Sequence, residues 1–428
     1  MTELQPKVTE RVLVAVDVAK YEHVVFVSDP SGATESFRIK NRRADFDQLR
    51  EKLVATGLPV QIGLEPTCSF HRNICYYFLS HGFEVRGIST LVLARTREAL
   101  HNSWDKNDFK DADVILYLMR QGMTQTLSEP FYIGYNHLQE LSKTYEQIVH
   151  RKTKIQHSII NHYLPIYFPE AHVFFRGSRT LWFNRMLKHF PVPSLVIQYT
   201  FDEFLQIASP ILGKVPYKHS LVQDFYSLAK ESIGIPVDKD SYEVKMFRYS
   251  VEEHERLNQQ LFDLQEEIEQ LLSDNKDYQI MKSVPGIGPL IALTILAEAG
   301  DLRRFRYERQ FLKYCGLNLS TEQSGVSRGF SRISKRGNPR LRRVFWQAAR
   351  GAIYTCKENN FTHKYERYVR TNPDNSNLKR KARVATAAKV ARVVFGLIKK
   401  NERYRSQIDG TNPGGRTRGN LDVEAALV

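Results

Sequence analysis

The sequence has few cysteines and no long apolar run, and these two absences exclude several classes of protein. Its four cysteines, Cys68, Cys75, Cys315 and Cys356, form no C-x-x-C pair and have no histidine at zinc-ligand spacing. This argues against a zinc finger and against a disulfide-stapled secreted domain. No segment approaches the roughly 20 consecutive apolar residues that a membrane span needs, and the first residues lack a signal-peptide core. We therefore expect a cytoplasmic protein without a membrane partner.

A basic excess is also absent from most of the chain. Residues 327–405 contain 22 lysines and arginines against four acids, whereas the other residues contain 40 basic and 43 acidic ones. A merely solubilising charge would be spread along the chain. A positive field confined to the C-terminal quarter instead favours a polyanionic partner, and nucleic acid is the usual one.

The patterning predicts an α/β N-terminal domain and a mainly helical remainder. At 428 residues, two or three domains are expected. Three β-branched runs between residues 11 and 40 read as an antiparallel meander, and helices alternating with strands follow up to about residue 100. This order predicts a mixed sheet with helices on its faces.

A heptad-like pattern occupies the middle of the chain. Five residues repeat at 4-3-4-3 spacing and predict a coiled-coil seam: Leu257, Leu261, Leu264, Ile268 and Leu271. A similar stretch runs from Leu138 to Ile159, and the two could pair within one chain or between subunits. We expect four parts: an N-terminal domain at 1–130, coiled-coil arms at 131–275 with an inserted helical subdomain at 164–240, a C-terminal domain at 276–405, and a disordered tail at 406–428.

Four carboxylates carry the first candidate site. Asp17 and Glu65 end two predicted strands, where open sheets place their sites. Asp108 and Asp111 share one face of a predicted helix; Asp105 and Asp113 lie close enough to be mistaken for them. Taken singly, each acid is more often a turn or cap residue. If the four converge, divalent cations must offset their repulsion, and oxygen ligands suit Mg²⁺ or Mn²⁺ at a phosphoryl-transfer site.

Ser324 is the second candidate centre. It precedes Gly325 in a predicted tight turn, and a serine hydroxyl needs activation before it can act as a nucleophile. Ser327, Ser331 and Ser334 are competitors that composition does not exclude. Seven basic residues that follow are candidates for binding nucleic acid: Arg328, Arg332, Lys335, Arg336, Arg340, Arg342 and Arg343.

The chain resembles a known family at these motifs. VLVAVDVAK, QIGLEPT and NDFKDADV resemble the acidic motifs of the DEDD transposases of the insertion sequence 110 family. SVPGIGPLIALTILAEAGDLRRF, YCGLNLSTEQSG and SRISKRGNPRLRR resemble its C-terminal transposase domain. Where the family often has proline after the GL of YCGL, this chain has Asn318, a loop variation that we do not expect to abolish activity.

The resemblance implies several properties. The N-terminal domain would be RuvC-like, a relative of ribonuclease H, with Asp17, Glu65, Asp108 and Asp111 binding the metal. Ser324 would be the nucleophile and form a covalent phosphoserine link to DNA. Family members are guided by a structured bridge RNA that pairs with donor and target DNA, and they assemble from dimers into tetramers with composite sites. A bacterial, nucleoid-associated location follows from this reading.

The leading hypothesis is therefore an RNA-guided DNA recombinase that moves an insertion sequence. Two alternatives are a metal-dependent Holliday-junction nuclease, in which water attacks instead of Ser324, and a non-catalytic RNA-binding scaffold, in which the acids only cap turns.

Overall fold

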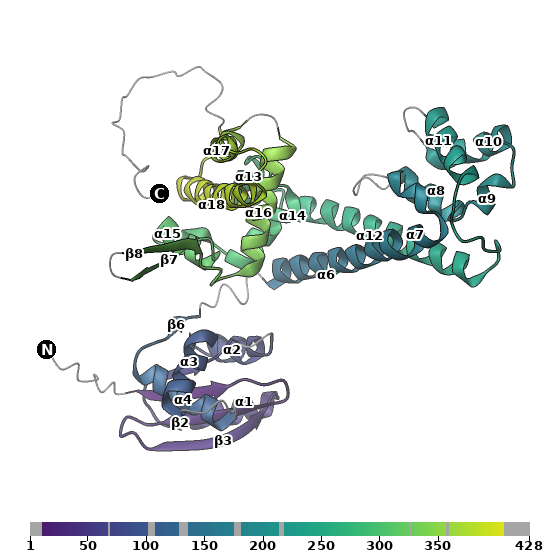
Figure 1. The fold of residues 1–428 in the computed structure, drawn as a ribbon. Coiled ribbons are helices and arrows are strands. Elements are labelled where there is room, and N and C mark those ends of the chain that lie inside the picture. Colours follow the sequence, from purple (N-terminus) through teal and green to yellow (C-terminus); the bar gives the residue numbers. More distant parts are fainter. Residues whose placement is uncertain are drawn as a thin grey trace. The chain divides into compact units, whose positions relative to one another are not determined.

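The computed structural model describes residues 11–66, 69–101, 108–127, 136–174, 181–213, 218–324, 327–356 and 359–405. The chain divides into two compact units, residues 1–137 and 138–428 (Figure 1). Among the helices of the described ranges, none is both long enough and apolar enough to cross a membrane.

A six-stranded mixed sheet forms the centre of the first unit, in the order β3-β2-β1-β4-β5-β6. The first three strands form an antiparallel meander, β4 and β5 continue parallel to β1, and β6 pairs antiparallel with β5. The strands are β1 (Val12–Asp17), β2 (Glu22–Ser28), β3 (Thr34–Lys40), β4 (Val60–Leu64), β5 (Glu84–Gly87) and β6 (Gln125–Thr126).

Helices cover both faces of this sheet because successive side chains of β1 point to opposite sides. Val12, Val14 and Val16 belong to a core shared with apolar residues of α1 (Arg43–Val54) and α2 (His71–Ser80). Leu13 and Ala15 face a second core formed with α3 (Thr90–His101) and α4 (Asp108–Arg120). The expected α/β fold is confirmed, and a meander followed by parallel strands between two helical layers is the RuvC-like, ribonuclease-H-like arrangement.

The second unit begins with a long helix and a subdomain rich in aromatic residues. Five fully buried phenylalanines anchor that subdomain: Phe168, Phe183, Phe204, Phe225 and Phe247. Its elements are α6 (Asn136–Ser158), the π-helix η1 (Ile159–Tyr163), α7 (Leu164–Tyr167), the 3₁₀-helix η2 (Pro169–Phe174), α8 (Leu181–His189), α9 (Ser194–Ile197), α10 (Phe201–Leu212), α11 (Lys218–Lys230) and α12 (Tyr242–Leu271).

The expected apolar seam follows α12 except at its last position. Leu257, Leu264 and Ile268 are buried, but Leu271 is 50% exposed and Leu272 is buried in its place. The prediction of Leu271 was wrong because α12 ends at this residue: Leu272 has left the helical conformation, with φ −104° and ψ 8°, and its side chain is the one that enters the core. Figure 1 shows α6 and α12 running alongside one another within one chain, and Ile155 of α6 packs against the core that contains Val251 of α12. Burial and the positive charge of Lys152, on α6, lower the pKa of His254 on α12 to about 4.

The C-terminal part of the second unit packs seven helices and a two-stranded hairpin. Asparagines cap its last three helices: Asn338, Asn359 and Asn375 each accept two backbone N–H groups of the first turn. The elements are α13 (Lys276–Lys282), α14 (Pro289–Ala299), the 3₁₀-helix η3 (Leu302–Arg304), α15 (Glu308–Tyr314), β7 (Leu319–Ser324), β8 (Ser327–Ile333), α16 (Pro339–Tyr354), α17 (Asn360–Val369) and α18 (Ser376–Lys400).

The VPGIG turn between α13 and α14 fits closely against α16. Gly286 has a φ of +84°, and a Cβ on it would lie 2.1 Å from the carbonyl oxygen of Ala348. Gly351 of α16 faces Gly286 across this contact. Gly288, in contrast, caps α14 in open space, because no described heavy atom lies within 4 Å of the position that its Cβ would take. The first glycine is therefore required for packing, and only the second is open to a ligand.

We predict that Gly286→Ala destabilises the second unit by about 2 kcal/mol or more, because the new methyl group is strained at positive φ and overlaps the backbone of α16. Gly288→Ala is the matched control and should leave the midpoint of urea unfolding within experimental error of wild type. Equal midpoints for the two variants would contradict the packing role of Gly286.

Candidate functional site

Asp17 and Glu65 lie at one edge of the sheet. β1 and β4 are parallel neighbours in which Val16 is opposite Leu64. Asp17 is the last residue of β1, and Glu65 directly follows β4. Both are half-buried. Because the two strands are adjacent and parallel, their carboxyl ends place these two acids side by side at the same edge of the sheet.

The same two acids face the layer that contains α4. Val16 and Leu64 point into the core under α1 and α2, so by strand alternation Asp17 and Glu65 belong to the opposite face. α4 covers that face closely, since a Cβ on Gly63 would lie 2.2 Å from the sulfur of Met119. Glycine at position 63 therefore allows the helix to close over the strand.

Asp108 and Asp111 occupy the first turn of α4. The start of this helix lies toward the carboxyl end of β1: the ring of Phe109 is 6.2 Å from that of Phe26, which pairs with Ala15. Asp108 is exposed, whereas Asp111 is only 1% exposed. The acidic turn is thus directed toward the end of the strand that Asp17 terminates.

Arg97 of α3 pairs with the buried Asp111. A carboxylate removed from water needs a compensating cation, and Arg97, itself 18% exposed, supplies it. Within the described ranges, no three histidine, cysteine or acidic side chains are grouped so as to hold a metal ion. The structure therefore brings Asp17 and Glu65 together and turns α4 toward them, while the convergence of all four acids stays a prediction.

We predict that Arg97→Gln lowers the stability of the first unit by about 3 kcal/mol, because it leaves Asp111 charged and buried. Adding Asp111→Asn should recover most of that loss, since the double variant buries no charge. Thermal unfolding of the two single variants and the double variant measures the coupling. Additive losses would show that the pair is not the reason for the burial of Asp111.

Ser324 is the last residue of β7, and its backbone pairs with Ser327 of β8. The two strands form an antiparallel hairpin with an irregular register between Thr321 and Gln323. The tight turn expected at Gly325 lies outside the described residues, as do Asp105, the tail at 406–428 and the side chains of Ser324, Ser327, Arg328 and Ser331. What the structure establishes is the placement of Ser324 near the tip of a hairpin.

Contacts within the protein hold Arg340, Arg342 and Arg343, which belong to the set of seven predicted basic residues. Arg340 binds Glu146 of α6 at 2.9 Å and Glu298 of α14 at 2.8 Å, and Arg343 binds Glu146 at 2.7 Å. Arg342 donates to the carbonyl of Lys335 at 2.9 Å. Burial opposes the charge of Arg340, but the hydrogen bond and charge of Glu298, with the charge of Glu146, outweigh it and raise the pKa of Arg340.

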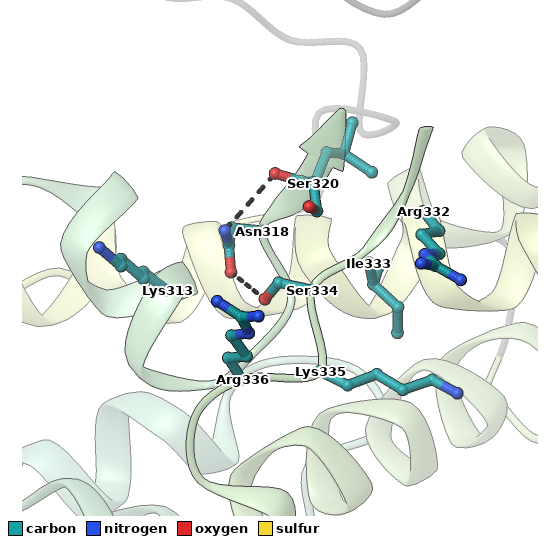
Figure 2. A pocket seen from close by; sticks show the side chains of 9 residues that line it. Lys313, Asn318, Ser320, Arg332, Ile333, Ser334, Lys335 and Arg336 are labelled. Atoms are coloured by element: carbon teal, nitrogen blue, oxygen red, sulfur yellow. Dashed lines mark hydrogen bonds between the residues drawn. The ribbon is translucent and has the colours of Figure 1, made fainter. Parts of the chain in front are cut away.

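The other described members of the set line a cavity. Arg332, Lys335 and Arg336 surround a hollow of about 520 Å³ at the base of the hairpin (Figure 2). Lys313 of α15 also lines it and was missed from the sequence, because it precedes the basic segment by more than a dozen residues. Composition alone could not show which of the basic residues line the cavity.

The mixed sheet of the first unit, with acids at two strand ends, places the chain among ribonuclease-H-like proteins. The model of the insertion sequence 110 DEDD enzymes, described as "Transposase", matches residues 14–169, and that of the "Transposase IS116/IS110/IS902 family" matches residues 278–366. The chain belongs to this family of transposases.

Individual relatives agree with the family models. The transposase for insertion sequence element IS1111A of Coxiella burnetii is 34% identical over 33% of this chain and 38% of its own length. A probable family 20 transposase of Pseudomonas aeruginosa is 29% identical over 38% of this chain and 47% of its own. The matched segments thus span less than half of each relative.

Proposed function

We propose that the chain is a transposase that cuts and rejoins DNA, using the acidic strand ends of the first unit and Ser324 of the second. The observation that carries the proposal is the presence on one chain, in the family's order, of both matched segments. A nuclease of the RuvC type would need only the first of them. The basic excess of residues 327–405 supports nucleic acid as the substrate.

Asp17, Glu65, Asp108 and Asp111 would hold divalent metal, Mg²⁺ or Mn²⁺, in this proposal. Four carboxylates supply only oxygen donors, which suits these hard cations. When bound, such ions offset charge on the scissile phosphate. Arg97 is paired with the buried Asp111 in the described structure, and would share this carboxylate with the metal.

Ser324 is proposed as the nucleophile. Its Oγ forms a bond to phosphorus as it gives up its proton, the bond from phosphorus to the 3′ oxygen breaks, and the leaving strand takes a proton to end in a 3′ hydroxyl. The DNA is then held as a phosphoserine ester until a hydroxyl reverses the step. Placement near the tip of a hairpin suits a side chain that must reach a phosphate on a large substrate.

The same proposal includes a guide RNA and an oligomer. A structured bridge RNA would pair with donor and target DNA, and dimers would assemble into tetramers in which one subunit's acids serve another's Ser324. The division of the chain into two compact units, one with each set of residues, is compatible with such shared sites. Sequencing the nucleic acid that co-purifies with the protein tests the RNA directly, since a discrete RNA species is expected.

We predict that Ser324→Ala abolishes the covalent protein–DNA adduct on a denaturing gel while DNA binding is kept. Ser327→Ala and Ser331→Ala, in the same hairpin, are matched controls and should still form the adduct. An adduct that survives in Ser324→Ala would move the nucleophile elsewhere. Cleavage without an adduct in that variant would instead favour attack by water and a junction nuclease.

We predict that Asp17→Asn reduces DNA cleavage by a factor of about 100 or more, on the order of the loss when a charged catalytic group is removed. Asp113→Asn is the control, because Asp113 is exposed on α4 and lies outside the proposed set. Chelation of divalent metal should abolish cleavage by wild type. If Asp17→Asn and Ser324→Ala both recombine DNA at the wild-type rate, the chain acts as a binding scaffold.

A further inference from the structure

The cavity at the base of the β7–β8 hairpin has an unusual lining. Four of its nine residues are basic and none is acidic; the nine are Lys313, Asn318, Leu319, Ser320, Arg332, Ile333, Ser334, Lys335 and Arg336. Figure 2 shows the guanidinium group of Arg336 directed toward Asn318 and Ser334, with Lys335 and Arg332 on the right of the view and Lys313 on the left. Like charges gathered around one hollow repel each other unless an anion joins them.

Three cations of this cavity differ from their neighbours in their lack of an acidic partner. Lys313, Lys335 and Arg336 form no ion pair with any carboxylate in the described part of the chain, whereas Arg340 and Arg343 are held by Glu146. The positive charge of these three residues at the hairpin base is therefore available to a ligand.

The wall of the cavity is fixed before any ligand arrives. The Ser334 hydroxyl donates to the Asn318 side chain at 2.6 Å, and the backbone N–H of Ser334 donates to the Asn318 carbonyl at 2.8 Å. The N–H of Asn338 donates to the carbonyl of Tyr314 at 2.7 Å, and Arg342 holds the carbonyl of Lys335. Bonds on both sides of Lys335 and Arg336 thus fix the backbone from which these side chains extend.

Lys335 has a backbone conformation that lysine rarely adopts. Its φ is +54°, and besides Asn401 it is the only non-glycine residue with positive φ in the described ranges. Asparagine or glycine would occupy this region at lower cost. A costly conformation at a residue that lines a binding cavity indicates that its side chain, and not its backbone, is what the position requires.

We propose that this cavity binds a backbone phosphate of the DNA strand whose scissile phosphate reaches Ser324. Cations without acidic partners beside a rigid wall suit phosphate oxygens and carry no base recognition. Ser320 lines the cavity and Ser324 follows four residues later on the same strand. At roughly 3.3 Å per residue this is about 13 Å. That is a separation of about two nucleotides on one strand, because its phosphates follow a helical path and lie farther apart than the roughly 3.4 Å rise per step along the axis. DNA is favoured over RNA because the hairpin that carries Ser324 also forms the cavity.

The inference rests on the proposed function, and the test keeps the two separate by measuring binding in the non-cleaving Ser324→Ala protein. The probe is a labelled DNA duplex with the end sequence that flanks the coding region, in which single phosphates are replaced by neutral methylphosphonates. One replacement, about two nucleotides from the bond that wild type cuts, should weaken binding about tenfold, as expected for a lost charged hydrogen bond.

Lys335→Asn, made in that protein, removes the charge while keeping a residue that tolerates positive φ. It should weaken DNA binding about tenfold, lower the slope of log affinity against log salt by about one, and leave the melting temperature unchanged or higher. In the Lys335→Asn protein, the same methylphosphonate should cause little further loss of DNA affinity. Lys239→Gln, an exposed lysine outside the basic segment, is the control and should behave as the parent protein.

Each failure has its own meaning. If Lys335→Asn binds DNA like Lys239→Gln, or if the interference pattern is unchanged by Lys335→Asn, the cavity does not hold a phosphate and the proposal is wrong. Loss of affinity for the guide RNA alone would also overturn it. If the cavity variant weakens DNA binding but wild type forms no Ser324 adduct, the phosphate site stands and the proposed nucleophile fails.

Discussion

The second unit depends on two carboxylates that are almost withdrawn from solvent. The side chains of Glu146 and Glu298 are 16% and 15% exposed, and both bind Arg340 at the start of α16. Glu298 also accepts from the side chain of Asn338, which caps the same helix. Because α16 begins directly after the loop that contains Lys335 and Arg336, these bonds fix the loop as well as the helix. Buried ion pairs contribute modestly to net stability, but loss of one partner is costly. Here they join α6 and α14 to the segment that forms the wall of the cavity.

The first unit also contains a buried carboxylate that an arginine compensates, but here the pair joins two neighbouring helices. Asp111 is buried where α4 closes over the sheet, and Arg97 from the neighbouring helix compensates it. Asp17 and Glu65 are half-buried at strand ends, where solvent or a cation can reach them. The close approach of Met119 to Gly63 brings α4 to the sheet beside these ends. Placement of the acids thus follows from helix packing, and packing alone would not keep several carboxylates charged and close together.

Much of the first unit could be predicted from the sequence because its signals are local. β-branched runs mark the strands, and the acids that end two neighbouring strands lie together at the carboxyl edge of the sheet.

The second unit was harder to predict, since the contacts that determine its structure join segments that are distant in the sequence. Arg340 and Arg343 look like their basic neighbours, and only the fold shows that Glu146, nearly two hundred residues earlier, engages both. Lys313 was missed for the converse reason: it lies outside the basic segment in sequence but faces its cavity in space. Spacing also misplaced the end of the seam, because Leu271 at the end of α12 is exposed and Leu272, directly after the helix, is buried.

The basic residues of the segment therefore fall into two groups: some form ion pairs within the protein, and others have no acidic partner in the described chain. Arginines that point back toward α6 and α14 are neutralised by acids and add little to the field outside the protein. Lys335 and Arg336 at the hairpin base have no acidic partner in the described chain, so their field is directed at whatever occupies the cavity. A net charge counted over residues 327–405 combines the two groups and overstates the charge available to nucleic acid. The number of phosphates that this surface can neutralise is set by the cations that acids do not already hold, and the salt dependence of binding should follow that smaller number.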